Sequence, residues 1–366
     1  MRLPPIEVIA SWPKPNYINP ESRAPISTVV GSIFLAFVTI ILLIRLYSRK
    51  QLTKGLGLDD ILICLAYIPA AAFTIVGIIT QEKFQWGRHL WDVEPKFYRP
   101  NLILTLVHLF LFDLTTSLTK LSMLAMVRRL TAASNNKIEN IVVLALAALI
   151  TVNCFLFITV EAFQCRPVSL GWTLHPSPSR NCIDEESHIF SAGIINTATD
   201  FAVVLLPIRT ALRIQLSPRQ RLVVASLFGI GFVASAVGIA RTVFTWLMLS
   251  APDYDSTWRS WYVWLTSLIE LHLGIICASV PATKPFFTAF TKKRWRSSHT
   301  LPSRIPPLAL YAGEEDEELG LRMPSLLHTG KNTSLRGYSV SFSDTTISPH
   351  QSRHTYTSPG PSRQSQ

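Results

Sequence analysis

Residues 140–160 read NIVVLALAALITVNCFLFITV and contain no charged side chain. About 20 consecutive apolar residues are enough for an α-helix to cross the hydrocarbon core of a bilayer. Two other stretches, 24–44 and 61–81, are equally long and also uncharged. These three segments therefore predict membrane-spanning helices.

Four further apolar stretches carry only one or two charged residues each. They are 101–127 with Asp113 and Lys120, 187–208 with Asp200, 222–250 with Arg241, and 260–283 with Glu270. None shows the alternation of a barrel strand, and only helices or closed barrels satisfy the backbone in lipid. We therefore predict an all-α fold, a polytopic membrane protein with a bundle of seven transmembrane helices and a disordered C-terminal tail.

The composition of the 366-residue chain supports a membrane protein over a soluble enzyme. Charged residues make up 16% of the chain, against roughly 25% in soluble domains. The net charge of +11 lies mostly in short blocks between apolar stretches, which is typical of the cytoplasmic face of a membrane protein. This pattern predicts the lipid bilayer as a partner and no nucleic acid. The five cysteines show no CxxC pair, so no metal site is expected.

The loops predict the orientation. Alternate loops, beginning with the one after the first helix, hold eleven lysine and arginine residues, and the other three hold seven. We therefore expect an extracellular N-terminal segment over 1–25, a transmembrane domain over 26–290 and a disordered cytoplasmic tail over 291–366. The prolines and the missing apolar core of residues 1–23 indicate no cleavable signal peptide. The expected location is the plasma membrane.

The predicted tail is rich in Ser, Thr, Pro, Gln and Gly, a composition typical of disorder. It is either a plain solvated tail or a site of regulation by phosphorylation. Candidate phosphosites follow an arginine by three residues or precede a proline, and they are Ser325, Ser339, Ser348 and Ser358.

Charged residues inside the predicted helices are expected to face the bundle interior and to find partners. Lys120 and Asp200 both lie about 12–14 Å from the predicted inner boundary at 1.5 Å per residue, so they can pair. Asp113 lies two turns above Lys120 on the same face, which makes a chain of the three feasible. Such a pair either fixes helix packing or serves a ligand or a proton.

Arg241 and Glu270 lie at matching depth in the outer half, which allows a second pair. With His108 and Glu161, these residues can ring a pocket that opens to the outside, the usual kind of ligand site in a helix bundle. Bonding between helices alone is the alternative. Intramembrane enzyme chemistry is not expected, because His108, His188 and His272 are isolated from one another in sequence.

Features of the predicted ends are simpler to interpret. Cys165 and Cys182 fall in the predicted outer loop between the fourth and fifth helices, where a disulfide would contribute about 3 kcal/mol. Asp59 and Asp60 precede the second apolar stretch, where acids cap a helix and favour its dipole. The outer tryptophans are expected to anchor the chain at the lipid interface, with an aromatic ligand cage as the alternative. They are Trp86, Trp91, Trp246, Trp258, Trp261 and Trp264.

The chain resembles the fungal seven-helix membrane proteins with a rhodopsin-like domain, which are related to the Pth-eleven-like receptor group. The resemblance covers roughly residues 25–290. The features that carry it are Arg45-Leu-Tyr-Ser-Arg49, Gly55-Leu-Gly-Leu-Asp59-Asp60, Gly87-Arg-His89, Trp91-Asp92-Val93, Thr119-Lys120-Leu-Ser122, Cys165-Arg-Pro167, Trp172, Cys182-Ile-Asp184, Asn196, Asp200, Pro207 and Arg241.

This resemblance implies a seven-helix fold with an extracellular N-terminus and a receptor-like role in sensing an unknown small molecule. It adds Asn196 to the intramembrane candidates. Members of the family also accompany fungal secondary-metabolite clusters, among them the satratoxin mycotoxin cluster. A carrier or efflux component for a secondary metabolite is the alternative function.

The family name does not imply a bound retinal here. Retinal-binding proteins attach the chromophore to a lysine in the middle of the last helix, and 260–283 contains no lysine. No cofactor is therefore expected. A G protein or another cytoplasmic signalling partner is expected only as a possibility to be tested, since Val127 precedes Arg128 where classical receptors carry an acid.

Overall fold

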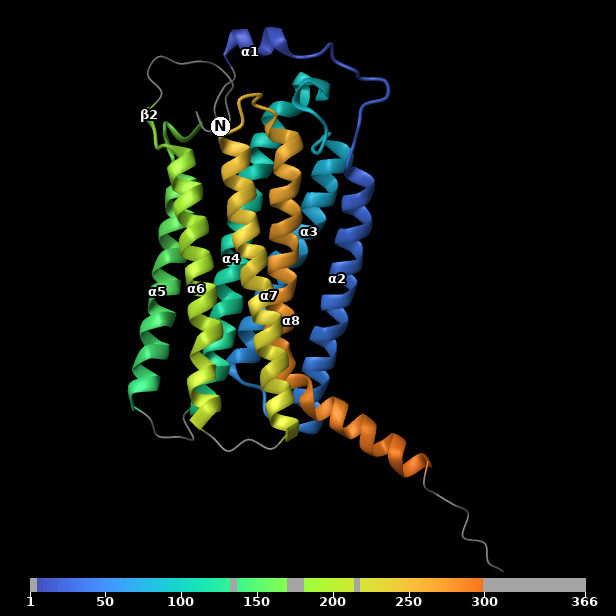
Figure 1. The fold of residues 1–366 in the computed structure, drawn as a ribbon, viewed down its shortest axis with the longest axis vertical. Coiled ribbons are helices and arrows are strands. Elements are labelled where there is room, and N and C mark those ends of the chain that lie inside the picture. Colours follow the sequence, from blue (N-terminus) through green and yellow to red (C-terminus); the bar gives the residue numbers. More distant parts are fainter. Residues whose placement is uncertain (1–4, 132–136, 170–180, 214–217, 299–366) are drawn as a thin grey trace, which may run out of the picture. The chain divides into compact units, whose positions relative to one another are not determined.

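Seven long helices make up most of the computed structural model, which describes residues 5–131, 137–169, 181–213 and 218–298 (Figure 1). Each is long and apolar enough to cross a membrane. Their bounds are α2 Ala24–Tyr47, α3 Leu58–Lys83, α4 Tyr98–Thr131, α5 Lys137–Ala162, α6 Glu185–Arg213, α7 Pro218–Leu249 and α8 Ser256–Ser298. All seven predicted stretches fall on these helices, so the predicted fold class is confirmed.

Short elements occupy the two ends of the bundle. At one end lie a short helix α1 (Ile6–Ser11), two 3-10 turns and a two-stranded hairpin of β1 (Cys165–Arg166) and β2 (Asn181–Cys182). The two turns are η2 (Leu90–Asp92) and η3 (Pro95–Phe97). We call this the disulfide end. At the opposite end, the Arg45 end, a π-helical turn η1 (Ser48–Leu52) continues α2.

The interior is built around α4 and α8. Helix α4 packs against α3, α5, α6 and α8, and α8 packs against α2, α3, α4 and α7. One apolar cluster includes Val38, Leu124 and Ile275, and a second includes Phe73 and Leu268. Side chains of α4 and α8 can therefore meet residues from most of the bundle.

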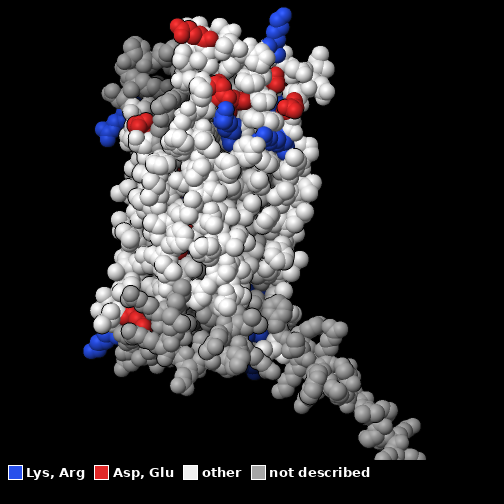
Figure 2. Space-filling view, viewed as in Figure 1, with Lys and Arg blue, Asp and Glu red and all other residues white. Residues whose placement is uncertain are grey.

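The exterior of the bundle is apolar along its length. Ile33, Phe37, Phe155 and Phe232 are each more than half exposed. Figure 2 shows Lys, Arg, Asp and Glu gathered toward the two ends, with a wide band between them that is almost free of such residues on the visible face. Large apolar side chains facing outward in such a band are typical of a lipid-exposed surface. The protein is therefore a multi-pass membrane protein.

Helix α8 bends away from the bundle at the Arg45 end (Figure 1). Pro281 and Pro285 lie inside the helix, and proline both removes a backbone hydrogen bond and forces a kink. The helix then continues to Ser298, beyond the boundary expected at 290, because neither proline nor glycine occurs between Pro285 and that residue. The four candidate phosphosites lie outside the described residues.

Candidate functional site

Lys120 on α4 and Asp200 on α6 form an ion pair in the bundle interior. Lys120 Nζ lies 3.1 Å from Asp200 Oδ1, and the two side chains are 7% and 20% exposed. The ammonium group also donates to the backbone oxygen and Oδ1 of Asn196, at 2.9 and 2.8 Å, and to Thr199 Oγ1 at 2.8 Å. An ammonium group has three protons to donate, so Lys120 is saturated by α6.

Arg241 on α7 and Glu270 on α8 form the second ion pair, which was expected from their matching depth. Arg241 Nε donates to Glu270 Oε2 at 2.8 Å, and both side chains are less than a tenth exposed. Asn196 Nδ2 donates to Glu270 Oε1 at 2.7 Å and to Asp200 Oδ2 at 3.4 Å. This amide joins the two pairs. We call Lys120, Asn196, Asp200, Arg241 and Glu270 the intramembrane network.

Asp113 and Glu161 lie next to this network but are not tied into it by a salt bridge among the described residues. Their carboxyl groups, on α4 and α5, are within hydrogen-bonding reach of each other, and Lys120 and Arg241 act on Asp113 electrostatically. His108 lies apart from them. Its Nδ1 donates to the backbone oxygen of Leu104 at 2.7 Å, and its ring packs edge-on against Phe73 of α3.

Two small cavities flank Lys120. One, of about 40 Å³, is lined by Asp200, Glu270 and Thr119, and the other, of about 30 Å³, by Asp113 and Asn196. A buried water needs about 10–15 Å³, so each cavity has room for only a few waters and neither admits a metabolite. His108, Glu161 and Arg241 line neither of them, so these two cavities are not the outward pocket expected from the sequence.

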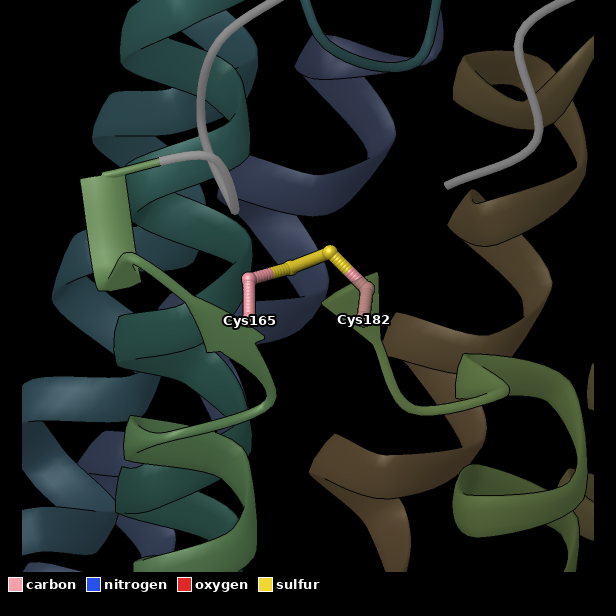
Figure 3. Close-up of a disulfide and its surroundings, with 2 residues drawn as sticks. All are labelled: Cys165 and Cys182. Carbon is pink, nitrogen blue, oxygen red and sulfur yellow. A yellow bond between two sulfur atoms is a disulfide. The ribbon is translucent and has the colours of Figure 1, made fainter. Parts of the chain in front are cut away.

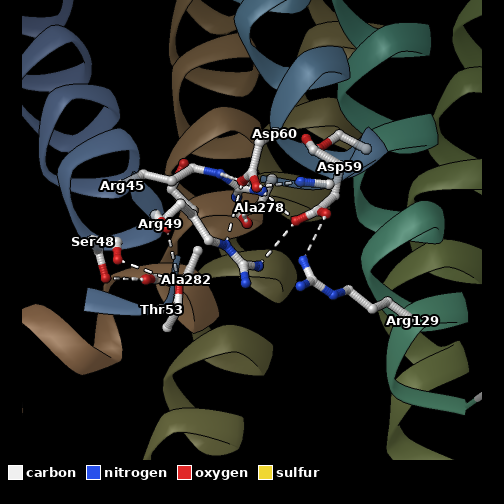
Figure 4. A network of polar contacts seen from close by, with 12 residues as sticks. Arg45, Ser48, Arg49, Thr53, Asp59, Asp60, Arg129, Ala278 and Ala282 are labelled. Atoms are coloured by element: carbon white, nitrogen blue, oxygen red, sulfur yellow. Dashed lines mark hydrogen bonds and ion pairs between the residues drawn. The ribbon is translucent and has the colours of Figure 1, made fainter. Parts of the chain in front are cut away.

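A second buried polar group lies at the Arg45 end (Figure 4). Arg45 is fully buried. Its Nε donates to Asp60 Oδ1 at 2.9 Å and its Nη2 to Asp59 Oδ2 at 2.8 Å. Arg49 Nη2 reaches the same Asp59 oxygen at 3.0 Å, and Arg129 Nη1 lies 3.6 Å from Asp59 Oδ1. We call these five residues the Arg45 cluster.

Sequence reasoning identified only part of this cluster. Asp60 does cap α3, since Gly57 N donates to Asp60 Oδ2 at 3.1 Å. The ion pairs were missed because Arg45 directly follows the uncharged stretch and was assigned to a loop. Helix α2 in fact continues to Tyr47, which keeps Arg45 in the bundle. The available signal was an arginine one residue past an apolar stretch, together with two adjacent acids, Asp59 and Asp60, directly before the next apolar stretch.

The Arg45 cluster also holds α8 and α4. Arg45 Nη1 donates to the backbone oxygen of Ala278 at 2.5 Å, and Ser48 Oγ donates to that of Ala282 at 2.8 Å. Both oxygens lie three residues before a proline of α8, where the kink loosens the regular helical bonding. Ser122 Oγ on α4 donates to the backbone oxygen of Asp59 at 2.7 Å. The cluster thus connects four helices.

A disulfide joins Cys165 and Cys182, as the sequence predicted, and the two cysteines are paired across β1 and β2 (Figure 3). It ties the end of α5 to the segment before α6. Cys64, Cys154 and Cys277 are not disulfide-bonded. Among the described residues, no group of three or more His, Cys, Asp and Glu side chains is placed to hold a metal ion.

Three of the six tryptophans expected at the lipid interface are buried. Trp86, Trp261 and Trp264 are each less than a tenth exposed, so the prediction that they anchor the lipid interface is wrong. Trp246, at 54% exposed, remains free to face lipid. The sequence misled because position along the chain does not show whether a tryptophan faces lipid or the interior, where Trp264 packs in the apolar cluster of Phe73 and Leu268.

An aromatic stack covers the disulfide end. The ring of His89 lies between those of Trp91 and Trp258, with centroids 4.7 and 4.2 Å away. The N-terminal segment lies over it, since Trp12 packs against Trp91 and the Arg23 guanidinium lies 3.6 Å above the Trp258 ring. Protein side chains therefore fill the space that an aromatic ligand cage would need.

The fold and the two buried polar groups define a seven-helix integral membrane protein. Residues 44–289 match the fungal rhodopsin domain, and the chain belongs to this family. The chain is 26% identical to the wortmanamides biosynthesis cluster protein C of Talaromyces wortmannii over 286 residues, which cover 76% of each chain. It is 23% identical to the receptor GIN3 of Arthrobotrys oligospora, over 78% of this chain and 67% of the relative. It is also 27% identical to a SAT4 family membrane protein of Emericella nidulans, over 59% and 53%.

Proposed function

We propose that the chain is a receptor that senses a small molecule and passes the signal through its helix bundle. The observation that carries this proposal is the connection between the two buried polar groups. Helix α4 contributes Lys120 to the intramembrane network and Arg129 to the Arg45 cluster. Helix α8 contributes Glu270 to the first and the Ala278 carbonyl to the second.

A shift of α4 or α8 at the network would therefore strain the cluster. Lys120 and Arg129 are separated by nine residues, or about 13 Å along a helix at 1.5 Å per residue. Packed cores respond to such shifts by changing between discrete arrangements. The residues that form the two groups supply the contacts that such a change must break and remake.

The proposed orientation places the disulfide end outside the cell and the Arg45 end in the cytoplasm, at the plasma membrane. A disulfide persists in oxidising compartments, which supports this assignment of the Cys165–Cys182 end. The loops that hold more lysine and arginine lie at the opposite end, in agreement with the same orientation. The tail would then be cytoplasmic and open to kinases.

The relatives support both the receptor class and a link to secondary metabolism. One is named a receptor, and two are named for biosynthesis clusters, the second being the fugralins biosynthesis cluster protein 2 of Gibberella zeae. We propose that the sensed molecule is a fungal secondary metabolite or its precursor. In the proposed orientation, the disulfide end is the side of the bundle that such a molecule would meet first.

A cellular response assay tests the proposal. Cells that express the chain are exposed to fractionated metabolite extract, and cytosolic calcium and cyclic nucleotides are recorded. We expect a response that is lost in Lys120→Met, which breaks the network, and kept in Lys137→Met, which removes an exposed charge at the start of α5. Equal responses in cells without the chain would count against a receptor.

The biosynthesis-cluster relatives also favour testing a carrier function. Uptake of labelled metabolite into proteoliposomes that contain the purified chain would support transport over sensing. The two small cavities beside Lys120 offer no passage for a metabolite in this conformation. We therefore expect binding without uptake.

We further propose that the chain is not an enzyme and works without retinal. The lysines of α8 are Lys284, Lys292 and Lys293, all near the Arg45 end of the helix. None stands at mid-membrane, where a chromophore would be attached. Adding retinal to the purified protein should therefore produce no visible absorption band that resists washing.

A further inference from the structure

Acidic side chains outnumber basic ones in the interior of the described bundle away from the Arg45 cluster. The acids are Asp113, Glu161, Asp200 and Glu270, and the bases are Lys120 and Arg241. Each base already has a partner, since Lys120 pairs with Asp200 and Arg241 with Glu270. Asp113 and Glu161 are the acids left over.

Glu161 is the more isolated of these two acids. It is 5% exposed, and its Oε2 is buried without a hydrogen-bond partner. Among the described residues, the charged group that acts on it is the carboxyl group of Asp113. An ionised carboxylate that is buried without a cation to compensate it is costly, so such a group tends to take up a proton instead.

The contact between the two carboxyl groups requires a proton. An ionised carboxylate only accepts hydrogen bonds, so two carboxylates at hydrogen-bonding distance repel each other. When one of them is protonated, its O–H donates to the other, and the pair carries a single negative charge. A hydrogen bond between the Asp113 and Glu161 side chains is therefore that of an acid with a carboxylate.

The surroundings stabilise one negative charge on the pair of carboxyl groups and include a cavity large enough for water. Lys120 and Arg241 both act on Asp113, which stabilises one carboxylate of the pair. The cavity of about 30 Å³ is lined by Asp113, Ser117 and Asn153, with room for about two waters. The titratable and charged groups from each helix packed there are Lys120 on α4, Cys154 on α5, His188 and Asp200 on α6, Arg241 on α7 and Glu270 on α8.

We propose that Asp113 and Glu161 form an intramembrane proton-binding site, in which the two carboxyl groups hold one proton between them at neutral pH. The proton exchanges with water in the adjacent cavity, and no covalent or redox step is involved. The proposal rests on the buried, unpartnered Glu161 oxygen and on the cavity beside Asp113. It stands whether or not the chain is a receptor.

Infrared difference spectroscopy of the full chain in lipid nanodiscs tests the site. At neutral pH we expect a carbonyl stretching band of a protonated carboxylic acid, which shifts in deuterated water. Glu161→Gln should remove this band, because an amide N–H then donates to Asp113 and the proton is no longer needed. Asp113→Asn should do the same from the other side.

The amide variants preserve the hydrogen bond, so both should remain folded, which helical circular dichroism checks. Asp253→Asn is the matched control, since it removes a carboxylate that lies outside the membrane and pairs with Arg259, and it should leave the band unchanged. A wild-type spectrum without the band, or a band that survives in both amide variants, would overturn the proposal. A sodium-dependent change in place of a deuterium-dependent one would also overturn it in favour of a metal cation.

Discussion

The two buried polar groups of the bundle differ in charge balance and in packing. The Arg45 cluster sets three arginines against two aspartates, with bonds at 2.8–3.0 Å from Arg45 and Arg49. The intramembrane network and its neighbours set four acids against two bases, next to two cavities and several unpartnered polar atoms. Fully satisfied polar networks rigidify a structure, and the cluster comes closer to this state, since Arg49 Nε, 3.4 Å from Asp60 Oδ1, is its one buried side-chain atom without a hydrogen-bond partner among the described residues. We therefore expect the Arg45 cluster to hold its helices rigidly together and the intramembrane network to be the region that can rearrange.

Removing Arg45 should have the largest effect on stability. Arg45→Met leaves two buried carboxylates without their main partner, and breaking a buried pair in this way costs about 3–5 kcal/mol. The variant should unfold at a lower temperature in detergent, measured by the reaction of buried Cys277 with a thiol dye. Lys50→Met, an exposed residue on the next turn, is the control and should change little. An Arg45→Met protein as stable as the wild type would remove the distinction between the two groups.

Removing Lys120 should cost less. Lys120→Met leaves Asp200 without its cation, but Asp200 keeps its contact with Asn196 and can take up a proton. We expect a loss of about 1–3 kcal/mol, the usual cost of an unsatisfied buried group. The double variant Lys120→Met/Asp200→Asn should recover part of that loss, because no unpaired charge remains. Thermal unfolding of the wild type, of Lys120→Met, of Asp200→Asn and of the double variant measures the coupling. Additive losses would show that the pair is not coupled.

The sequence predicted the positions of the helices far better than the contacts of the individual charged side chains. Seven apolar stretches were sufficient to define the bundle, because length and hydrophobicity decide insertion in lipid. Depth along a helix also indicated Lys120–Asp200 and Arg241–Glu270 correctly as pairs that the structure brings together. Depth does not give rotation about the helix axis, so His108 was grouped with Glu161 although it faces Phe73.

The Arg45 cluster and the aromatic stack needed information that a linear pattern lacks. Arg45 became a buried residue because its helix continues for two residues past Arg45, and such ends cannot be located to that precision from composition. The stack of His89 between Trp91 and Trp258 depends on the loop before α4, the first turn of α8 and the N-terminal segment meeting at one end. Contacts between segments so distant in sequence follow only from the assembled bundle.

Added methyl groups should distinguish the tight region from the roomy one. A Cβ at Gly57 would overlap the Asp59 carboxylate, which its arginines hold in place, whereas one at Gly274 would meet only the Thr119 methyl at 3.4 Å. Gly57→Ala should cost about 1–3 kcal/mol through overpacking. Gly274→Ala should be neutral or stabilise by up to about 1 kcal/mol, because alanine favours the helix. Unfolding midpoints of both variants provide the measurement, and equal losses would contradict the difference in packing.

A charge pair outside the membrane provides the smallest effect and the reference for both groups. Burial alone would raise the pKa of Asp253, but hydrogen bonds from Arg259 and from the backbone N–H of Asp255 outweigh it and lower the pKa. A carboxyl group whose pKa is lowered by folding stabilises the protein above its unfolded pKa and loses this contribution as the pH falls through the folded value. Because the Asp253 side chain is 41% exposed, solvent screening keeps the contribution below about 1 kcal/mol. Asp253→Asn should therefore lower the unfolding midpoint slightly at neutral pH and not at all in acid. A loss as large as that of Lys120→Met would mean that exposure does not separate this pair from the buried ones.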